Sequence, residues 1–134
     1  MKNISEEEVL SILRAAKTIA IVGISNDKSR ISYKIGEVLQ QAGYKIIPVN
    51  PLVEEILGEK TYPSLLDIKE HVDIVNVFRR SDYVYEVAEQ FLEMDATLFW
   101  CQLGVVNEGA YDLINNEHRK VLMDSCIQVM YSKL

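Results

Sequence analysis

Cysteine and histidine are scarce in this sequence, with two residues of each. Cys101 and Cys126 belong to no CxxC motif, and with only His71 and His118 besides, no zinc framework is visible. No apolar run reaches the roughly 18 residues of a membrane-spanning helix, and the first residues lack the basic-then-apolar order of a secretory signal. We therefore expect a cytoplasmic protein without a structural disulfide.

Positive charge is also in short supply, because 14 basic residues face 20 acidic ones and the net charge is −6. A general nucleic-acid binder needs a basic face that displaces counterions from phosphates, so the charge argues against that class. The hydrophobic fraction of 49% and the charged fraction of 25% are ordinary globular values. The length suits one core, and we expect residues 1–134 to form a single domain in which any anion site is local.

Two apolar patterns alternate along the chain. Short apolar runs typical of strands occupy 18–23, 44–50, 73–78, 97–101 and 120–124, and helical spacing covers about 5–16, the segment ending at Gly43, a segment beginning near Ser81, and 107–117. The segment between the second and third strands is predicted to be irregular, with one short helix at 64–69.

The strand runs are nearly continuous in apolar residues, which is typical of strands covered on both faces. Strands and helices also alternate in order, as they do in parallel sheets flanked by helices. We therefore predict an α/β fold with a single doubly wound, five-stranded parallel sheet and helices on both faces. In such a sheet the ligand crevice lies at the carboxyl ends of the strands, where the winding direction reverses.

The first of these strand ends reads GISNDKSRIS, residues 23–32, and has one glycine where dinucleotide-binding turns usually have three. Glycine lets the backbone approach a ligand, the free N–H groups of the next helix favour an anion, and three serine hydroxyls can donate hydrogen bonds. Residues 25–34 contain three basic residues and one acidic residue, a local charge of +2. The candidate residues are Gly23, Ile24, Ser25, Ser29, Arg30 and Ser32. A capped, solvated turn is the alternative.

The second strand is followed by Asn50 and Pro51, which bear on the choice of nucleotide. A site for NAD normally has Asp or Glu here to bind the ribose hydroxyls. A neutral residue accepts instead a ribose that carries its own phosphate. Among common nucleotides, this leaves NADP or coenzyme A (CoA).

The third and fourth strand ends complete the predicted rim. Phe78, Arg79 and Arg80 follow the third strand, and Gln102 and Gly104 follow the fourth. Paired guanidinium groups suit phosphate oxygens because each offers a planar fork of donors. The alternative is that these arginines pair with acidic residues on the surface.

Taken together, the segments IVGISNDKSRISYKIGEVLQQAGYKIIPVNP, ILGEKTYPSLLDI, VDIVNVFRRSD and WCQLGVVNEGA make the chain resemble stand-alone CoA-binding proteins of the YccU type. These are Rossmann-like domains similar to the CoA-binding domain of the succinyl-CoA synthetase alpha subunit. The resemblance implies pyrophosphate on the loop 23–32, the 3′-phosphate region near Asn50 and the arginines, and pantetheine past the third and fourth strand ends. Two departures are Ile31, where the family commonly has proline, and Ser125, where it usually has a basic residue.

The leading hypothesis is a protein that binds CoA or an acyl-CoA without catalysis of its own, as a carrier, sensor or regulatory module. The alternatives are an NADP-binding domain of a partner-dependent oxidoreductase and an interaction module with an empty crevice. No catalytic or metal-ligating set is evident, and no nucleic-acid or membrane partner is expected. Cys101 is the reactive candidate, for a mixed disulfide with CoA, or else a small buried apolar residue. His71 and His118 are expected at the surface.

Overall fold

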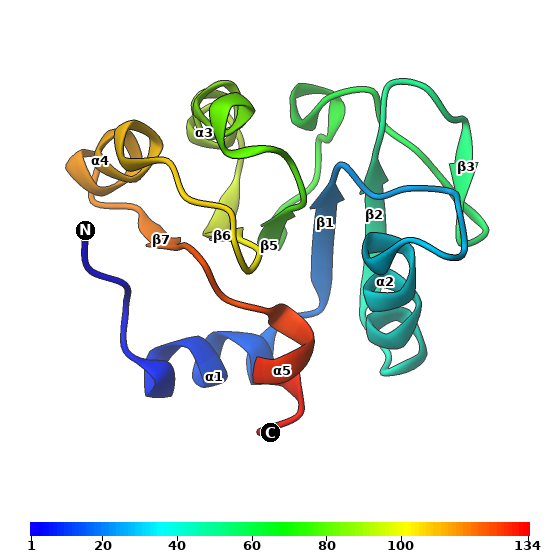
Figure 1. Cartoon of the computed structure of the whole chain (residues 1–134), viewed down its shortest axis with the longest axis horizontal. Helices are drawn as coiled ribbons and strands as arrows, with labels where there is room; N and C mark the ends of the chain where they lie inside the picture. The colour runs from blue at the N-terminus through cyan, green and yellow to red at the C-terminus, as the bar shows by residue number, and fades with distance from the viewer.

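The computed structural model describes residues 1–134 and contains a five-stranded parallel sheet in the order β2-β1-β5-β6-β7 (Figure 1). The strands are β1 (Thr18–Val22), β2 (Lys45–Val49), β5 (Val72–Val77), β6 (Ala96–Cys101) and β7 (Lys120–Leu122). All four neighbouring pairs are parallel. The predicted doubly wound α/β fold is confirmed.

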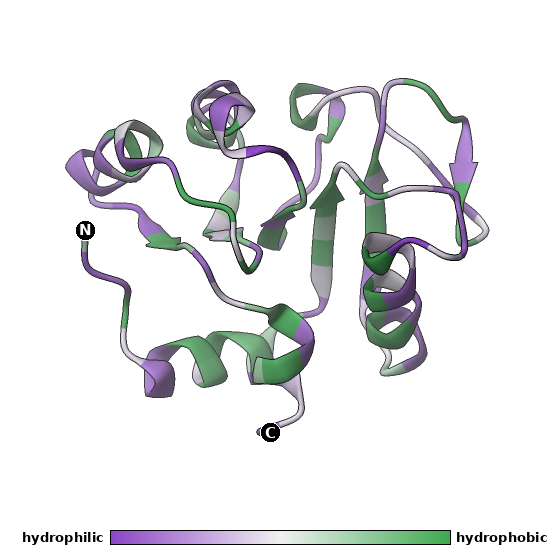
Figure 2. Ribbon diagram, viewed as in Figure 1, coloured by the Kyte–Doolittle hydropathy of each residue, from purple (hydrophilic) through white to green (hydrophobic).

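Helices cover both faces of the sheet (Figure 1). One face carries α1 (Glu6–Ala15), α2 (Ile31–Gln41) and α5 (Ile127–Tyr131), and the other carries α3 (Val84–Leu92), α4 (Glu108–Asn116) and the short 3-10 helix η1 (Leu65–Asp67). Successive strand residues enter opposite cores, because strand side chains alternate between faces. In Figure 2 strand β1 is mainly hydrophobic, and the helices carry both hydrophobic and hydrophilic residues.

Three short elements were not expected from the sequence. The predicted irregular segment contains a hairpin of β3 (Glu55–Ile56) and β4 (Glu59–Lys60), and a 3-10 turn, η2 (Ser81–Tyr83), precedes α3. The hairpin turn places Leu57 and Gly58 at positive φ, a conformation for which leucine gives no sequence signal. The third element, α5, has only five residues, too few for a helical periodicity to be evident.

The winding reverses between β1 and β5, so the ends of these two strands define the crevice. The backbone is very tight there. Gly23 has a φ of +85°, and a Cβ atom at this position would lie 2.5 Å from the carbonyl oxygen of Phe78. The loop after β1 therefore runs directly against the chain leaving β5, which only glycine allows.

The opposite, amino-terminal edge of the sheet is joined by a charged cluster around His71. Its Nδ1 lies 2.8 Å from Asp95 Oδ1 and its Nε2 lies 3.2 Å from Asp73 Oδ1. Asp73 in turn accepts hydrogen bonds from the backbone N–H groups of Lys17 (2.7 Å) and Thr18 (3.0 Å). His71 is exposed, as expected, but the cluster links the starts of three strands, β1, β5 and β6.

Folding shifts the pKa values of His71 and Asp73 in opposite directions. The hydrogen bond to Asp95 raises the pKa of His71 above its ordinary value. Burial alone would raise the pKa of Asp73, but the hydrogen bonds from Lys17 and Thr18 outweigh burial and lower that pKa overall. Folding therefore favours the protonated imidazole.

We predict that His71→Asn lowers stability at mildly acidic pH and not at alkaline pH. Because the folded-state pKa is raised, the stabilisation is complete below the ordinary value of 6.5 and disappears as the pH rises through the raised pKa. The loss should stay below about 1 kcal/mol, since the side chain is half exposed and solvent screens the pair. Denaturant unfolding across this pH range measures it.

The control is His118→Asn, since His118 is exposed, forms no ion pair, and has a φ of 57° that asparagine tolerates. This variant should keep the pH dependence of the parent protein. An undiminished pH dependence in His71→Asn would contradict the prediction.

Candidate functional site

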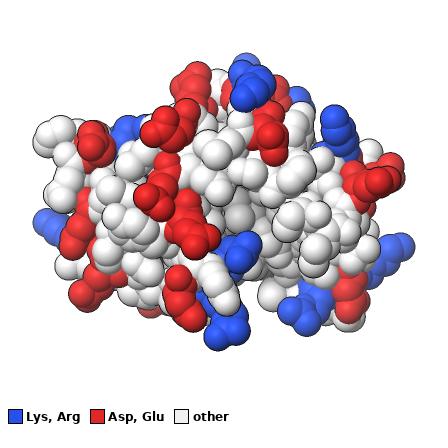
Figure 3. All heavy atoms as spheres, turned by 90° about the horizontal axis from the view of Figure 1, so that it is seen from above, with Lys and Arg blue, Asp and Glu red and all other residues white.

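Two adjoining cavities lie at the carboxyl ends of the strands. The first, here called the α2 cavity, has a volume of about 550 Å³ and lies between the start of α2, the ends of β5 and β6, and the segment before α5. The second, the α3 cavity, has a volume of about 410 Å³ and lies between the ends of β1 and β2 and helix α3. Arg79 lines both. Seen from above, the molecule is hollowed near its middle, with basic side chains beside the hollow and acidic ones gathered over α3 and α4 (Figure 3).

The start of α2 has the features of a candidate anion site. Its N-cap residue, Arg30, makes no side-chain capping bond, and its first turn contains no acidic residue. By contrast, α1 and α4 are capped by Ser5 and Asn107 and begin with glutamates. Because Arg30, Ile31 and Ser32 line the α2 cavity, the free N–H groups of this first turn lie at its wall.

The serine hydroxyls before α2 are largely used within the loop. Ser29 Oγ donates to Asp27 Oδ1 at 2.7 Å, and this bond helps to lower the pKa of Asp27. Ser25 Oγ accepts from the N–H of Asp27 at 2.9 Å, and Ser32 Oγ accepts from the N–H of Ser25 at 3.0 Å. Ser32 lines the α2 cavity and its hydroxyl hydrogen remains free, whereas Ser25 and Ser29 line neither cavity. Most of the loop hydroxyls therefore shape the turn.

The arginines after β5 differ in their surroundings. Arg79 is half-buried, has no acidic partner, and its guanidinium carbon lies 5.2 Å from the ring centroid of Tyr83. Arg80 is mostly exposed and lies 3.7 Å from Asp82, although it also lines the α2 cavity. Arg30, like Arg79, forms no ion pair. Two guanidinium groups, those of Arg79 and Arg30, are thus available at the crevice.

Three other candidate residues have their polar groups engaged by the protein. Asn50 donates from Nδ2 to the carbonyl of Ile24 at 2.9 Å and accepts from the N–H of Leu52 at 2.8 Å. Ile24 is fully buried in the core, and the N–H of Gly104 donates to Asp124 at 2.7 Å. Asn50 and Pro51 line the α3 cavity, while Ile24 and Gly104 line neither cavity. Asn50 therefore joins the ends of β1 and β2.

Gln102 lies in the wall of the α2 cavity and is 7% exposed. Its Oε1 accepts from the N–H of Ile127 at 3.3 Å and from Asn76 Nδ2 at 3.5 Å. Its Nε2 makes no hydrogen bond within the protein. The remaining wall contains a second amide, Gln128, and the apolar residues Ile31, Ile35, Phe78, Leu103, Val105 and Cys126. The cavity thus combines an apolar wall with two amide side chains, and the uncapped start of α2 lies at its edge.

Of the two interpretations of Cys101, the structure supports the small buried apolar residue. Cys101 is fully buried in the core, and burial raises its pKa to about 12, so its thiol has neither access nor thiolate character. Cys126 is half-buried and lines the α2 cavity. Sequence analysis offered no reason to favour Cys126, because the short helix α5 that follows it was not predicted.

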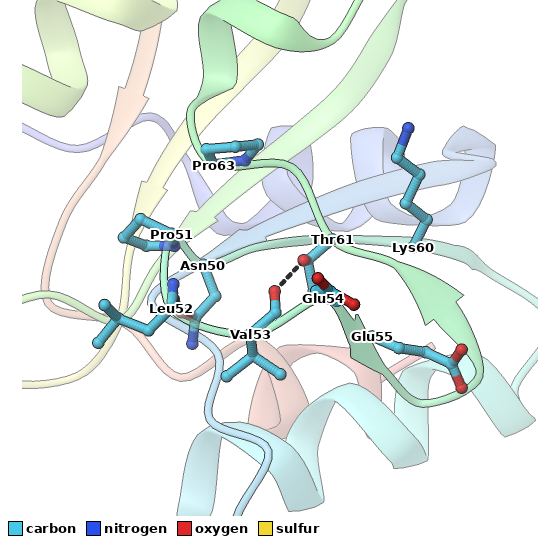
Figure 4. Close-up of a pocket in the computed structure, with 9 residues that line it drawn as sticks. All are labelled: Asn50, Pro51, Leu52, Val53, Glu54, Glu55, Lys60, Thr61 and Pro63. Carbon is cyan, nitrogen blue, oxygen red and sulfur yellow. Dashed lines mark hydrogen bonds between the residues drawn. The ribbon is translucent and has the colours of Figure 1, made fainter.

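A third and larger concavity of about 830 Å³ lies beside the β3–β4 hairpin (Figure 4). It shares Asn50, Pro51, Leu52 and Pro63 with the α3 cavity. Its lining contains two carboxylates, Glu54 and Glu55, and a single ammonium group, Lys60, which points away from both, and Thr61 Oγ1 donates a hydrogen bond to the carbonyl of Val53. Its charge disfavours phosphate, so the arginine side of the rim is the better candidate for an anion site.

Two further kinds of site can be compared with the structure. No group of three or more His, Cys, Asp and Glu side chains is arranged to hold a metal ion. None of the helices combines the length and apolar character that crossing a bilayer requires. The crevice at the carboxyl ends of the strands therefore remains the candidate site to compare with known proteins.

Residues 17–132 match the family described as CoA binding domain. The chain belongs to this family. It is 48% identical to the uncharacterized protein YneT of Bacillus subtilis, over 98% of each protein. A solved structure from Thermus thermophilus, 32% identical, superposes with a TM-score of 0.92 and covers 97% of this chain and 98% of that one.

A longer relative contains a similar region. An ADP-forming acetate–CoA ligase of Methanocaldococcus jannaschii is 32% identical over 60% of this chain. The match spans 12% of that ligase's length, so it shows a shared domain and not a shared activity. This kinship agrees with the expected similarity to CoA-binding domains of larger synthetases.

We predict that Gly23→Ala destabilises the fold more than Gly58→Ala does. Both glycines have similar positive φ values, +85° and +75°, so both substitutions carry a conformational cost of about 1–2 kcal/mol. Only at Gly23 would the new Cβ meet backbone, at 2.5 Å from Phe78 O, while Gly58 has no atom within 4 Å. The clash should add about 1–3 kcal/mol.

Denaturant unfolding of the two variants measures this difference. Equal losses would show that the loop after β1 can move away from β5, and that the tight approach does not define the rim.

Proposed function

We propose that this protein binds CoA or an acyl-CoA in the crevice formed by the α2 and α3 cavities. The observation that carries the proposal is the uncapped start of α2, which lies across the crevice from Arg79, a guanidinium without an acidic partner. Membership of the CoA-binding domain family and the match to the acetate–CoA ligase support it.

The chemistry of each part suggests an orientation for the cofactor. The pyrophosphate lies at the α2 N–H groups and between Arg30 and Arg79, where donors and positive charge coincide. The adenosine and its 3′-phosphate extend into the α3 cavity, beside Pro51 and Arg79. The pantetheine chain follows the apolar α2 cavity past Phe78 and Gln102.

Asn50 has a permissive role in this arrangement. Both ends of its amide are bonded to the protein, so it offers the ligand no strong contact. Its neutrality nevertheless leaves the second strand end without a carboxylate, which would repel a ribose phosphate. The crevice therefore favours CoA or NADP over NAD, and the long apolar α2 cavity suits pantetheine better than nicotinamide.

The linings of the two cavities place no nucleophile within hydrogen-bond reach of a base, and the Ser29–Asp27 pair lies outside both cavities. His71, the histidine with carboxylate partners, lies at the opposite edge of the sheet. A carrier, sensor or regulatory role for bound CoA accounts for these features.

Titration calorimetry with four ligands tests the proposal. We expect CoA to bind, dephospho-CoA to bind more weakly because it lacks the 3′-phosphate, and NADP and NAD to bind more weakly still. A preference for NADP over CoA would favour a domain of an oxidoreductase. Absence of binding by all four would favour an interaction module and refute the proposal.

The arginines provide a charge-matched test. Arg79→Ala and Arg30→Ala should each weaken CoA binding by about tenfold or more, since each removes charge-assisted hydrogen bonds to phosphate. The effect should be larger at low salt than at high salt, because salt screens exposed charge pairs. Lys28 lies in the same loop as Arg30 and carries the same charge, but it lines neither cavity. Lys28→Ala should therefore change affinity little. Equal losses for all three variants would show that only net charge matters.

A further inference from the structure

Cys126 occupies a fixed position in the wall of the α2 cavity. The residue before it, Ser125, donates its N–H to the carbonyl of Cys101 at 3.3 Å and accepts from Trp100 Nε1 at 2.8 Å. The residue after it, Ile127, donates its N–H to Gln102 Oε1 at 3.3 Å. Hydrogen bonds to the end of β6 thus hold the backbone on both sides, while the half-buried thiol borders the cavity.

Gln102 supplies an independent sign that this cavity receives a ligand. Its side chain is more than nine-tenths buried, yet its Nε2 has no hydrogen-bond partner in the protein and lies in the same cavity wall as Cys126. The orientation of the amide is fixed, because its Oε1 already accepts from Ile127. The Nε2 atom itself is not sealed in the protein, so a ligand in the cavity can reach this donor, and the amide carbonyls of a pantetheine chain can accept from it.

The two cysteines therefore differ sharply in access. Cys101 faces the core on the other side of β6, where no ligand reaches it. Cys126 lies along the apolar wall of the α2 cavity, with the uncapped start of α2 at its edge, and Arg30, Ile31 and Ser32 line the same cavity. A cofactor held by its phosphates at that end extends its thiol terminus along the wall that contains Cys126.

We propose that Cys126 is a thiol-exchange site at which CoA becomes covalently attached as a mixed disulfide. The inference rests on the proposed function, CoA binding in the crevice. In the step, the Cys126 thiolate attacks one sulfur of CoA disulfide, the Cys126–CoA disulfide forms, and the original disulfide bond breaks. The released CoA thiolate takes up the proton that Cys126 gave up, so no further oxidant or reductant is needed. Excess reduced thiol reverses the step.

Such an exchange would make retention of the cofactor depend on the redox state of the CoA pool. Reduced CoA leaves at the rate set by its contacts with the rim, whereas the mixed disulfide leaves only after reduction. Recognition of the nucleotide end should make the reaction selective, because binding holds the reacting sulfur near Cys126 and raises its effective concentration.

The experiment follows adduct formation by intact-protein mass spectrometry with peptide mapping. The parent protein, Cys126→Ser and Cys101→Ala are each incubated with CoA disulfide or with oxidised glutathione, which lacks the nucleotide. We expect one CoA adduct on Cys126 in the parent protein and in Cys101→Ala, none in Cys126→Ser, and full reversal by dithiothreitol. CoA disulfide should react at least about tenfold faster than oxidised glutathione, and adenosine 3′,5′-bisphosphate should slow it to the glutathione rate.

Calorimetry of the parent protein with reduced CoA, in the presence of reductant, separates the two proposals. If reduced CoA binds but Cys126 remains unmodified, or the adduct maps to Cys101, the exchange site is refuted and the proposed function stands. If reduced CoA does not bind and the two disulfides react at equal rates, both proposals are refuted. Peptide mapping of the parent protein gives the result even if Cys101→Ala fails to fold.

Discussion

The close approach of the loop after β1 to the chain leaving β5 sets the geometry of the crevice. Gly23 and Phe78 touch with no room for a side chain. The contact directs the loop toward the start of α2 and places Arg79, the next residue after Phe78, between the two cavities. A bulkier residue at position 23 would separate the strand ends that the site joins. A single backbone contact thus positions both the α2 N–H groups and the guanidinium.

The electrostatics of the rim are local and oppose the charge of the whole molecule. The chain has a net charge of −6, and acidic side chains gather over α3 and α4 (Figure 3). At the rim, however, the uncapped start of α2 lacks acidic residues, and Arg30 and Arg79 form no ion pair, although Glu86 lines the α3 cavity together with Arg79. Arg80 is balanced by Asp82 instead. An anion therefore finds favourable charge in one place, and the acidic surroundings disfavour binding elsewhere.

Elements set by local pattern were predicted well from the sequence. The five strands, the main helices and the position of the crevice follow from apolar runs and their order, and Gly23 and Arg79 follow from their places at strand ends. Contacts between a side chain and a residue distant in the sequence could not be predicted. Asn50 bonds to Ile24, 26 residues away, and His71 lies beside Asp95, 24 residues away. The sequence also missed Cys126, because its neighbours are fixed by Trp100 and Gln102 and not by a recognisable helix.

A crystal structure of the protein with CoA would show whether the crevice holds the cofactor as proposed. We expect density for the pyrophosphate at the first turn of α2 beside Arg79, with the pantetheine chain running past Gln102 toward Cys126. Cofactor bound in the concavity beside the β3–β4 hairpin, or a crevice filled by the protein's own side chains, would contradict it.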